Sequence, residues 1–401
     1  MNIFTKIFTR TFQGILYVAM NFLSFKEPKM IESEEGIKSL PNYVKSLGKK
    51  SILLVTDESL FSLGLVNPLI EQAKLDNVPL VVYHGVVANP TVDNVEEGLK
   101  VLKENNCDVV IAIGGGSALD AAKMIAARAT NSRKTVSKMK GLLKVTHKPL
   151  MLIAVPTTAG TGSETTVAAV IVDKKNNDKY AVNDPKLIPP FALLDPNLLV
   201  GLPKHITSTT GMDALTHAVE AYIGKANTKK TKKYARSAVK LIFENLLNSY
   251  NEPTNITYRK NMQIASYDAG VAFTRAYVGN VHSLAHSLGG QYNVPHGLAN
   301  ALLLPLVLKK YGKSAHKKLA ELADLIGVDS SFNIEQKATW FISQIEELNS
   351  KMNITNTVGH LIKDEGLDFL VNHSYKESIP LYPTPRLLSK EELKEIYLEL
   401  R

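Results

Sequence analysis

The stretch that decides the fold is Cys107-Asp-Val-Val-Ile-Ala-Ile-Gly-Gly-Gly-Ser-Ala-Leu-Asp120. Its first seven residues have the length and largely apolar composition of a parallel β-strand that is covered on both faces. The glycines let the backbone approach a ligand closely, and a helix that begins after them would offer unpaired N–H groups to a pyrophosphate. Their placement between strand and helix favours this over a tight turn without ligand. The spacing is not Gly-x-Gly-x-x-Gly, so a standard Rossmann loop is not expected.

Three more apolar runs of this kind lie in the first half of the chain, at residues 51–57, 79–83 and 150–155. Helical patterns at residues 92–105 and 118–129 separate the runs. This alternation predicts an α/β domain with a parallel sheet and right-handed crossovers. After about residue 205 the strand pattern stops, and we expect successive helices.

The second half contains Asp213-Ala-Leu-Thr-His217, followed by His282, His286 and His296. On a helix, Asp213 and His217 project from one face, and so do His282 and His286, because each pair is four residues apart. A carboxylate with several imidazoles forms a mixed set that suits a divalent transition metal. Structural zinc sites are usually built from cysteines, so the set indicates a catalytic metal. Any one of these histidines alone would more often be a core residue.

Two further loops follow predicted strands. Asp57 ends the first strand, where an acid can bind a ribose diol and repel a 2′-phosphate, which favours NAD over NADP. The same residue could equally cap the following helix. The loop at residues 155–164, Val-Pro-Thr-Thr-Ala-Gly-Thr-Gly-Ser-Glu, is rich in hydroxyls and small residues. It is suited to contact a phosphate or a nicotinamide edge.

Together these segments resemble the iron-containing (group III) alcohol dehydrogenases, from about residue 25 to the C-terminus. The matching segments are Val55-Thr-Asp57, Gly85-Val-Val-Ala-Asn89-Pro90, Gly114-Gly-Gly-Ser117-x-x-Asp120, Pro156-Thr-Thr-Ala-Gly-Thr161-Gly-Ser-Glu164, Gly211-Met-Asp213-Ala-Leu-Thr-His217, Gly279-Asn-Val-His282-Ser-Leu-Ala-His286 and Pro295-His296-Gly297-x-Ala-Asn300. The resemblance implies the fold shared with dehydroquinate synthase, with a cleft for nicotinamide and metal between two domains. We expect an N-terminal helical extension over residues 1–24, an α/β dinucleotide-binding domain over 25–205 and an all-α metal-binding domain over 206–401.

The resemblance also assigns roles to residues. It implies metal ligation by Asp213, His217, His282 and His296, and it places His286 near the substrate, where this residue could carry a proton. The cofactor residues that it implies are Asp57, Asn89, Gly114, Gly115, Gly116, Ser117, Asp120, Thr157, Thr158, Thr161 and Lys179. Iron(II) is the metal that the resemblance implies, although the order of divalent-metal affinities favours zinc.

The expected activity is hydride transfer between a small primary alcohol or aldehyde and NAD, with the metal acting as a Lewis acid on the substrate oxygen. Phe273 and the stretch around Tyr382 are candidates for the substrate pocket. A cyclase resembling 3-dehydroquinate synthase is an alternative, but it would need several basic residues, and residues 272–279 contain only Arg275. Zinc-dependent glycerol dehydrogenase is a nearer alternative that lacks the Asp-x-x-x-His pair. A non-catalytic metal- or nucleotide-binding protein is a third.

Composition sets the remaining expectations. Cys107 is the single cysteine of the 401 residues, which excludes an intrachain disulfide and fits a reducing, cytoplasmic compartment. Residues 225–240 contain seven basic residues and no acidic one. Because Tyr234 is the only aromatic residue among them, a solvated helix face is favoured over a nucleic-acid patch. We expect a small-molecule alcohol or aldehyde as partner, no nucleic acid, and a homodimer or higher homo-oligomer.

Residues 4–24 are predicted to form an amphipathic helix that packs on the body of the protein or on a partner subunit. The apolar run of this region, Phe12 to Phe25, is interrupted by Gln13 and Asn21 and is shorter than the roughly 20 residues that a bilayer span requires. No membrane span is therefore expected. A peripheral membrane role is the alternative for this segment.

Overall fold

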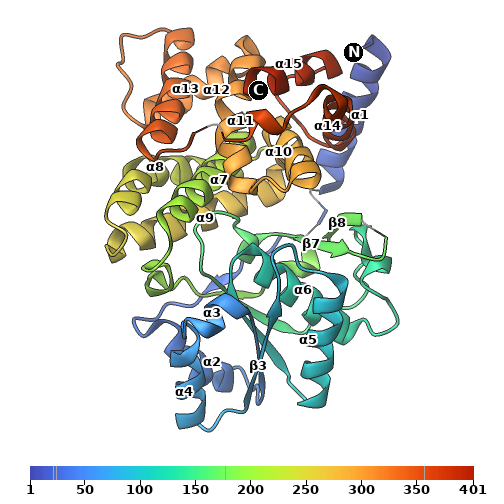
Figure 1. The fold of residues 1–401 in the computed structure, drawn as a ribbon, viewed down its shortest axis with the longest axis vertical. Helices are drawn as coiled ribbons and strands as arrows, with labels where there is room; N and C mark the ends of the chain where they lie inside the picture. The colour runs from blue at the N-terminus through green and yellow to red at the C-terminus, as the bar shows by residue number, and fades with distance from the viewer. Residues whose placement is uncertain (21, 24, 177, 356) are drawn as a thin grey trace. The chain divides into compact units, whose positions relative to one another are not determined.

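The computed structural model describes residues 1–20, 22–23, 25–176, 178–355 and 357–401. The chain divides into two compact units, Ser24–Gly201 and a second unit that combines Met1–Leu23 with Leu202–Arg401. The first unit is an α/β unit and the second is a helical unit (Figure 1).

The α/β unit is built on a six-stranded parallel sheet in the order β1-β9-β6-β4-β2-β3. Its strands are β1 (Lys29–Met30), β2 (Ile52–Asp57), β3 (Leu80–Val86), β4 (Val109–Gly114), β6 (Met151–Pro156) and β9 (Phe191–Ala192). A smaller sheet has the order β5-β8-β7. Its strands are β5 (Gly141–Leu142), β7 (Ala168–Asp173) and β8 (Asp178–Asn183). The four apolar runs of the first half are therefore strands of one parallel sheet, as predicted.

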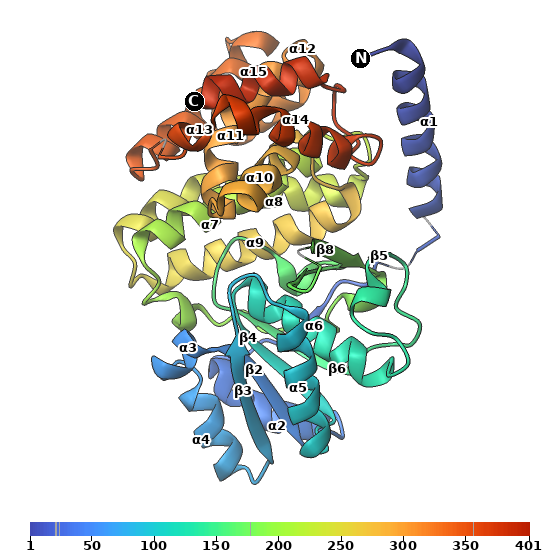
Figure 2. The same cartoon turned by 45° about the vertical axis from the view of Figure 1, so that its right-hand side comes forward.

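Helices lie on both faces of the large sheet. Figure 2 shows α5 (Val92–Glu104) and α6 (Gly116–Thr130) side by side on one face, and α2 (Leu40–Ser46) and α4 (Asn67–Leu75) on the other. Strand β4 is buried at every position, which is why its sequence is continuously apolar rather than alternating. The core on the α5/α6 side joins alternate residues of β2 and β4, such as Val55 and Ala112, to the alanine-rich face of α6.

The strand order determines where a ligand can bind in this unit. The chain goes from β2 outward to β3 and then returns to the other side of β2 as β4. This reversal creates a switch point, and ligands of open α/β sheets bind outside the carboxyl ends of the strands there. We call the loops at these ends the strand-end edge: Asp57, residues 87–91, residues 114–117 and residues 157–162.

The helical unit contains the second half of the chain, as predicted. Its α-helices after residue 201 are α7 (Lys204–Ile223), α8 (Lys229–Asn251), α9 (Ile256–Ala276), α10 (Asn280–Tyr292), α11 (His296–Tyr311), α12 (Lys313–Leu325), α13 (Ile334–Lys351), α14 (Asp364–Ser378) and α15 (Lys390–Leu400). Helix α7 is buried over nearly its whole length and packs against α8, α9 and α11. A helix that is enclosed on all sides can present polar side chains only to a site inside the protein.

The predicted N-terminal helix is α1 (Ile3–Met20), and residues 21 and 24 of the predicted range lie outside the described residues. It is amphipathic, but its polar face is the one that packs on the rest of the helical unit. Thr9 and Gln13 are buried, whereas Phe4 is 81% exposed and Phe8 63%. The inward face is polar because it supplies hydrogen-bond donors to backbone carbonyls of residues 380–385. In the described part of the chain no helix is long and apolar enough to cross a membrane.

Candidate active site

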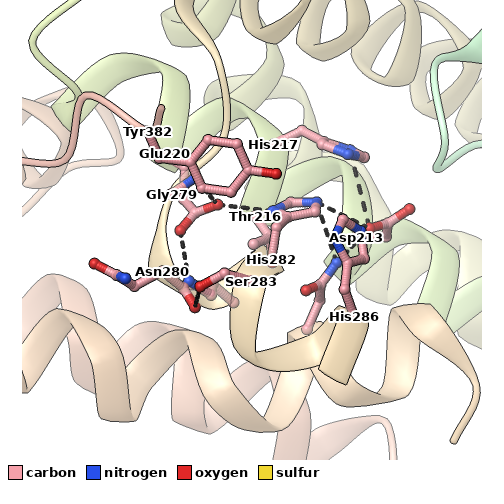
Figure 3. A network of polar contacts seen from close by, with 12 residues as sticks. Asp213, Thr216, His217, Glu220, Gly279, Asn280, His282, Ser283, His286 and Tyr382 are labelled. Carbon is pink, nitrogen blue, oxygen red and sulfur yellow. Dashed lines mark hydrogen bonds and ion pairs between the residues drawn. The ribbon is translucent and has the colours of Figure 1, made fainter. Parts of the chain in front are cut away.

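Four metal-ligating side chains meet inside the helical unit. Asp213 and His217 come from α7, His282 from α10, and His296 is the first residue of α11. One ligand atom of each lies within 4.8 Å of the others, and all but His296 are buried. Figure 3 shows Asp213, His217 and His282 turned toward one another, with Glu220 on the far side of the His282 ring. We call these four residues the metal cluster.

The spacing of the cluster fits a single bound cation. The Oδ1 atom of Asp213 lies 3.9 Å from His217 Nδ1, 3.8 Å from His282 Nε2 and 3.3 Å from His296 Nε2. Two ligand atoms that bind one zinc-sized ion tetrahedrally at roughly 2.1 Å lie about 3.4 Å apart. The observed separations are therefore compatible with one ion bound between these atoms. One oxygen and three nitrogens also form a donor set that suits iron(II) or zinc.

Asn300 marks the point on which these atoms converge. Its Nδ2 amide lies 2.7 Å from Asp213 Oδ1, 3.1 Å from His296 Nε2 and 3.3 Å from His282 Nε2. Three acceptor atoms from three helices thus face one electropositive group. Burial alone would raise the pKa of Asp213, but the imidazoles of His217 and His296 lower it below its usual range. The carboxylate is accordingly ionised, as a metal ligand must be.

Behind the cluster, Glu220 holds His282. Its Oε2 lies 2.7 Å from His282 Nδ1, and its two oxygens accept the backbone N–H groups of Gly279 at 2.7 Å and Val281 at 2.8 Å. Burial raises the pKa of Glu220 to about 7, although the backbone hydrogen bonds oppose the shift. A carboxylate on one ring nitrogen leaves the other nitrogen as the acceptor, which is the usual arrangement behind a metal-binding histidine.

His286 lies beside the cluster without joining it. Its ring stacks on that of His296, with centroids 5.1 Å apart, and meets His282 edge-on at 5.8 Å. Its Nδ1 lies 2.6 Å from Glu377 Oε1, a contact between α10 and α14. Phe273 stacks on His217 at 4.0 Å and supplies an apolar wall to the cluster.

In the α/β unit, the glycines lie at the centre of the strand-end edge. Gly114 ends β4, Gly115 is the residue before α6, and Gly116 begins that helix. A Cβ on Gly114 would lie 2.5 Å from the Ala118 Cβ, so the turn has no room for a side chain there. A Cβ on Gly115 would instead meet Thr158 at an ordinary 3.7 Å. The protein itself therefore does not require glycine at position 115, but a closely approaching ligand would.

Asn89, Lys179 and Ser117 are linked by hydrogen bonds. The Lys179 ammonium on β8 donates to the Asn89 side chain at 2.7 Å, and the Asn89 N–H donates to the Ser117 hydroxyl at 3.3 Å. Burial lowers the pKa of Lys179. Asp57 accepts the backbone N–H of Leu60 at 3.0 Å, so the capping alternative for this residue is realised in the structure. Its second oxygen lies beside Gly114.

The side chain of Asp120 holds the loop at residues 155–164 in place through hydrogen bonds. The Asp120 carboxylate accepts Ser163 Oγ at 2.6 Å and the Val170 N–H at 2.9 Å. The buried Lys123 ammonium donates to Ser163 Oγ at 2.9 Å. The Thr157 N–H donates to Gly114 O at 3.0 Å, which ties this loop to the glycine turn. Asp120 therefore positions the loop that carries Thr158 and Thr161.

Comparison with known proteins identifies the family. The sequence model of "Iron-containing alcohol dehydrogenase" matches residues 28–196, and that of the "Fe-containing alcohol dehydrogenase family, C-terminal" matches residues 207–400. The chain belongs to the iron-containing alcohol dehydrogenase family. This confirms the predicted family, fold and enzyme class: the protein is an alcohol oxidoreductase that uses NAD and a divalent metal.

Individual members of the family match nearly the whole chain. Alcohol dehydrogenase 4 of Schizosaccharomyces pombe is 36% identical over 88% of this chain and 83% of its own length. The NAD-dependent methanol dehydrogenase of Bacillus methanolicus is 33% identical over 93% of this chain and 98% of its own length. Among solved structures, a 1,3-propanediol oxidoreductase aligns with a TM-score of 0.89 at 32% identity, covering 95% of this chain and 100% of that one. An alcohol dehydrogenase from Oenococcus oeni also aligns with a TM-score of 0.89 at 32% identity, covering 94% of this chain and 100% of that one.

Sequence reasoning missed three residues that this dehydrogenase places around its metal cluster. Glu220 follows His217 by three residues on α7, and Asn300 follows His296 by four on α11, so helical spacing could have found both. Glu377 lies 91 residues from His286. No local spacing connects these two, because their contact depends on how α10 and α14 pack.

Proposed function

We propose that the protein interconverts small primary alcohols and aldehydes at the metal cluster, with NAD bound along the strand-end edge. The convergence of Asp213, His217, His282 and His296 on one point supports this most directly. When bound there, a divalent metal supplies Lewis-acid polarisation of the substrate oxygen. The four residues hold the ion, and Glu220 keeps the His282 ring in the ligating tautomer.

The strand-end edge is the proposed dinucleotide site. Gly114, Gly115, Gly116 and Ser117 lead into the N-terminus of α6, whose unpaired N–H groups suit a pyrophosphate. Asp57 would accept a ribose hydroxyl and repel the 2′-phosphate of NADP. The remaining residues that we assign to the cofactor are Asn89, Asp120, Thr157, Thr158, Thr161 and Lys179. Among these, the half-buried carboxylate of Asp120 acts by positioning its neighbours.

His286 is the proposed proton carrier. Its ring adjoins His296 and His282, and its side chain is 41% exposed. It can therefore accept a proton released near the cluster and pass it to solvent. Phe273 stacks on His217 and makes this side of the metal cluster apolar, which suits a carbon chain rather than a polyanion.

An assay of NADH formation tests this function. Protein purified without oxygen would be offered methanol, ethanol, butanol and 1,3-propanediol, before and after treatment with a chelator and reloading with Fe²⁺ or Zn²⁺. We expect alcohol-dependent NADH formation that the chelator abolishes and metal restores, with Fe²⁺ as the native ion. A cyclase of the dehydroquinate synthase type would yield no net NADH, and a binding protein would bind NAD without turnover. Either result would contradict the proposal.

We also propose that the enzyme is a cytoplasmic homodimer or higher homo-oligomer. The outward face of α1 exposes Ile3, Phe4, Ile7, Phe8 and Ile15, and such apolar faces commonly mark a contact with another protein. Analytical ultracentrifugation of the full chain, and of a Phe4→Ser/Phe8→Ser variant, would test this. A wild-type sedimentation coefficient of a monomer would refute it.

A further inference from the structure

Helix α1 lies outside the residues that the family models match, yet it makes specific contacts with the helical unit. Two of its side chains donate four hydrogen bonds to the backbone of residues 380–385, which we call the 380–385 loop. Gln13 Nε2 donates to Pro380 O at 2.9 Å and to Tyr382 O at 2.8 Å. Arg10 donates to Thr384 O at 2.9 Å and to Pro385 O at 3.3 Å. Arg10 also donates to Gln13 at 2.8 Å.

The 380–385 loop needs donors from outside because three of its six residues are prolines. Proline has no N–H, so the loop has few donors for its own carbonyl groups, and buried carbonyls require partners. Apart from the four bonds from α1, the Lys225 N–H donates to Pro383 O at 2.6 Å, and the Thr384 N–H donates to Tyr382 O at 2.9 Å. The polar face of α1 therefore supplies most of the support for this loop.

The loop in turn places Tyr382 against Glu377. The buried Tyr382 hydroxyl donates to Glu377 Oε1 at 2.7 Å. The same carboxylate oxygen lies 2.6 Å from His286 Nδ1. Two groups thus fix one oxygen of Glu377, and the direction of the carboxylate determines the direction of the imidazole.

This arrangement repeats, at His286, the one that Glu220 makes at His282. The two histidines are four residues apart on α10, and each has a carboxylate oxygen within 2.7 Å of its Nδ1. A carboxylate acceptor at Nδ1 favours the tautomer with the proton there, so that Nε2 carries the lone pair. In His286 the lone pair then lies on the side of the ring away from Glu377.

We propose that Glu377 and Tyr382 are positioning residues for His286, and that α1 is the clamp that holds them in place through Arg10 and Gln13. The inference rests on the proposed role of His286 in handling the proton. It gives the N-terminal helix a function within its own subunit: keeping Nε2 of His286 in the acceptor state and orientation that proton transfer requires. In this role Glu377 and Tyr382 act through His286 rather than on the substrate itself, and Arg10 and Gln13 act through the 380–385 loop.

A double-mutant cycle in the metal-loaded, full-length enzyme tests the link between Glu377 and His286. Glu377→Gln should lower kcat about tenfold, the lower end for loss of a supporting carboxylate, while metal content and the KM for NAD stay unchanged. In a His286→Ala background the same substitution should have no further effect, because residues that act as a unit are not additive. Equal losses in both backgrounds would show a merely structural role and overturn the proposal.

A spectroscopic measurement tests the same link without activity. In ¹⁵N-histidine NMR of the zinc-loaded protein, the His286 resonances are assigned by their loss in His286→Ala. We expect the Nδ1–H tautomer in the wild type and a tautomer mixture in Glu377→Gln. An unchanged tautomer would overturn the positioning role whatever the reaction is. Absence of NADH formation with a normal wild-type tautomer would instead refute only the proposed function.

The clamp is tested by Arg10→Ala/Gln13→Ala, with Lys6→Ala/Thr11→Ala as the matched control on the exposed part of α1. Hydrogen exchange in peptides that cover the 380–385 loop should be faster in the first variant and unchanged in the second. The kcat should fall several-fold in the first variant alone, and this loss should disappear in the His286→Ala background. Unchanged exchange and kcat in Arg10→Ala/Gln13→Ala would refute the clamp.

Discussion

The metal cluster and the strand-end edge use different parts of the chain for binding. In the cluster, side chains from three helices converge on one point, and other side chains such as Glu220 and Asn300 hold them. At the strand-end edge, two acidic side chains that were predicted to bind the cofactor bond instead to nearby parts of the protein. Asp57 caps α3 (Glu58–Ser62), and Asp120 binds Ser163 and Val170. In the proposed cofactor site, the backbone and the glycines are therefore the groups that would meet the ligand. Substitutions should therefore act through chemistry in the cluster and through shape at the edge.

The largest effect is expected in the cluster. His296→Ala removes one ligand, so both bound metal and activity should be lost, with kcat/KM falling about a thousandfold because several kcal/mol of Lewis-acid stabilisation disappear. Metal analysis and NADH formation measure the two losses. His360→Ala is the matched control, because His360 is exposed and lies outside the cluster. Full metal content in His296→Ala would contradict its role as ligand.

The next prediction concerns the buried carboxyl group of Glu164, which follows the strand-end edge in sequence. Burial raises the pKa of Glu164 to about 7, from an ordinary 4.5. A folded-state pKa above the unfolded value means that stability falls as pH rises from 4.5 toward 7. This difference corresponds to about 3 kcal/mol of unfolding free energy. Glu164→Gln should remove this pH dependence of stability. The melting temperature of the variant should therefore rise relative to that of the wild type between pH 5 and pH 8. Parallel melting curves at both pH values would contradict this.

A smaller effect tests whether the backbone at the edge meets the cofactor. Gly115→Ala adds a methyl group that the protein itself accommodates at 3.7 Å from Thr158. We therefore expect an unchanged melting temperature and a KM for NAD that is about thirtyfold higher, because a closely bound pyrophosphate must move away. Gly201→Ala is the control, since nothing lies within 4 Å of its added methyl group. An unchanged KM for NAD in Gly115→Ala would place the cofactor elsewhere.

The smallest effect tests the charge at the end of β2. Asp57→Asn keeps the helix cap, for which asparagine serves as well as aspartate, and removes the negative charge. The ratio of kcat/KM for NADP to that for NAD should rise about tenfold, or 1.4 kcal/mol. Glu58→Gln, which neutralises the adjacent acid, should leave the ratio nearly constant. A constant ratio in Asp57→Asn as well would limit Asp57 to its capping role.

The sequence by itself determined the fold class and the types of group in the site. Apolar runs such as residues 109–113 favour strands covered on both sides, and the four-residue spacing of Asp213 and His217 places both on one face of a helix. These are local periodicities, which a chain carries without reference to its tertiary contacts.

Local spacing left open which histidines meet Asp213, and only the tertiary structure shows what brings them together and what holds them. Spacing alone allowed His282 and His286 to be a pair of metal ligands. In the folded protein His282 lies against Asp213, whereas His286 contacts Glu377. The orientation of α1 was equally hidden, because its amphipathic pattern predicts an apolar contact and its actual partner is a row of carbonyl groups. Contacts between residues far apart in the sequence depend on how helices pack, and no local pattern encodes them.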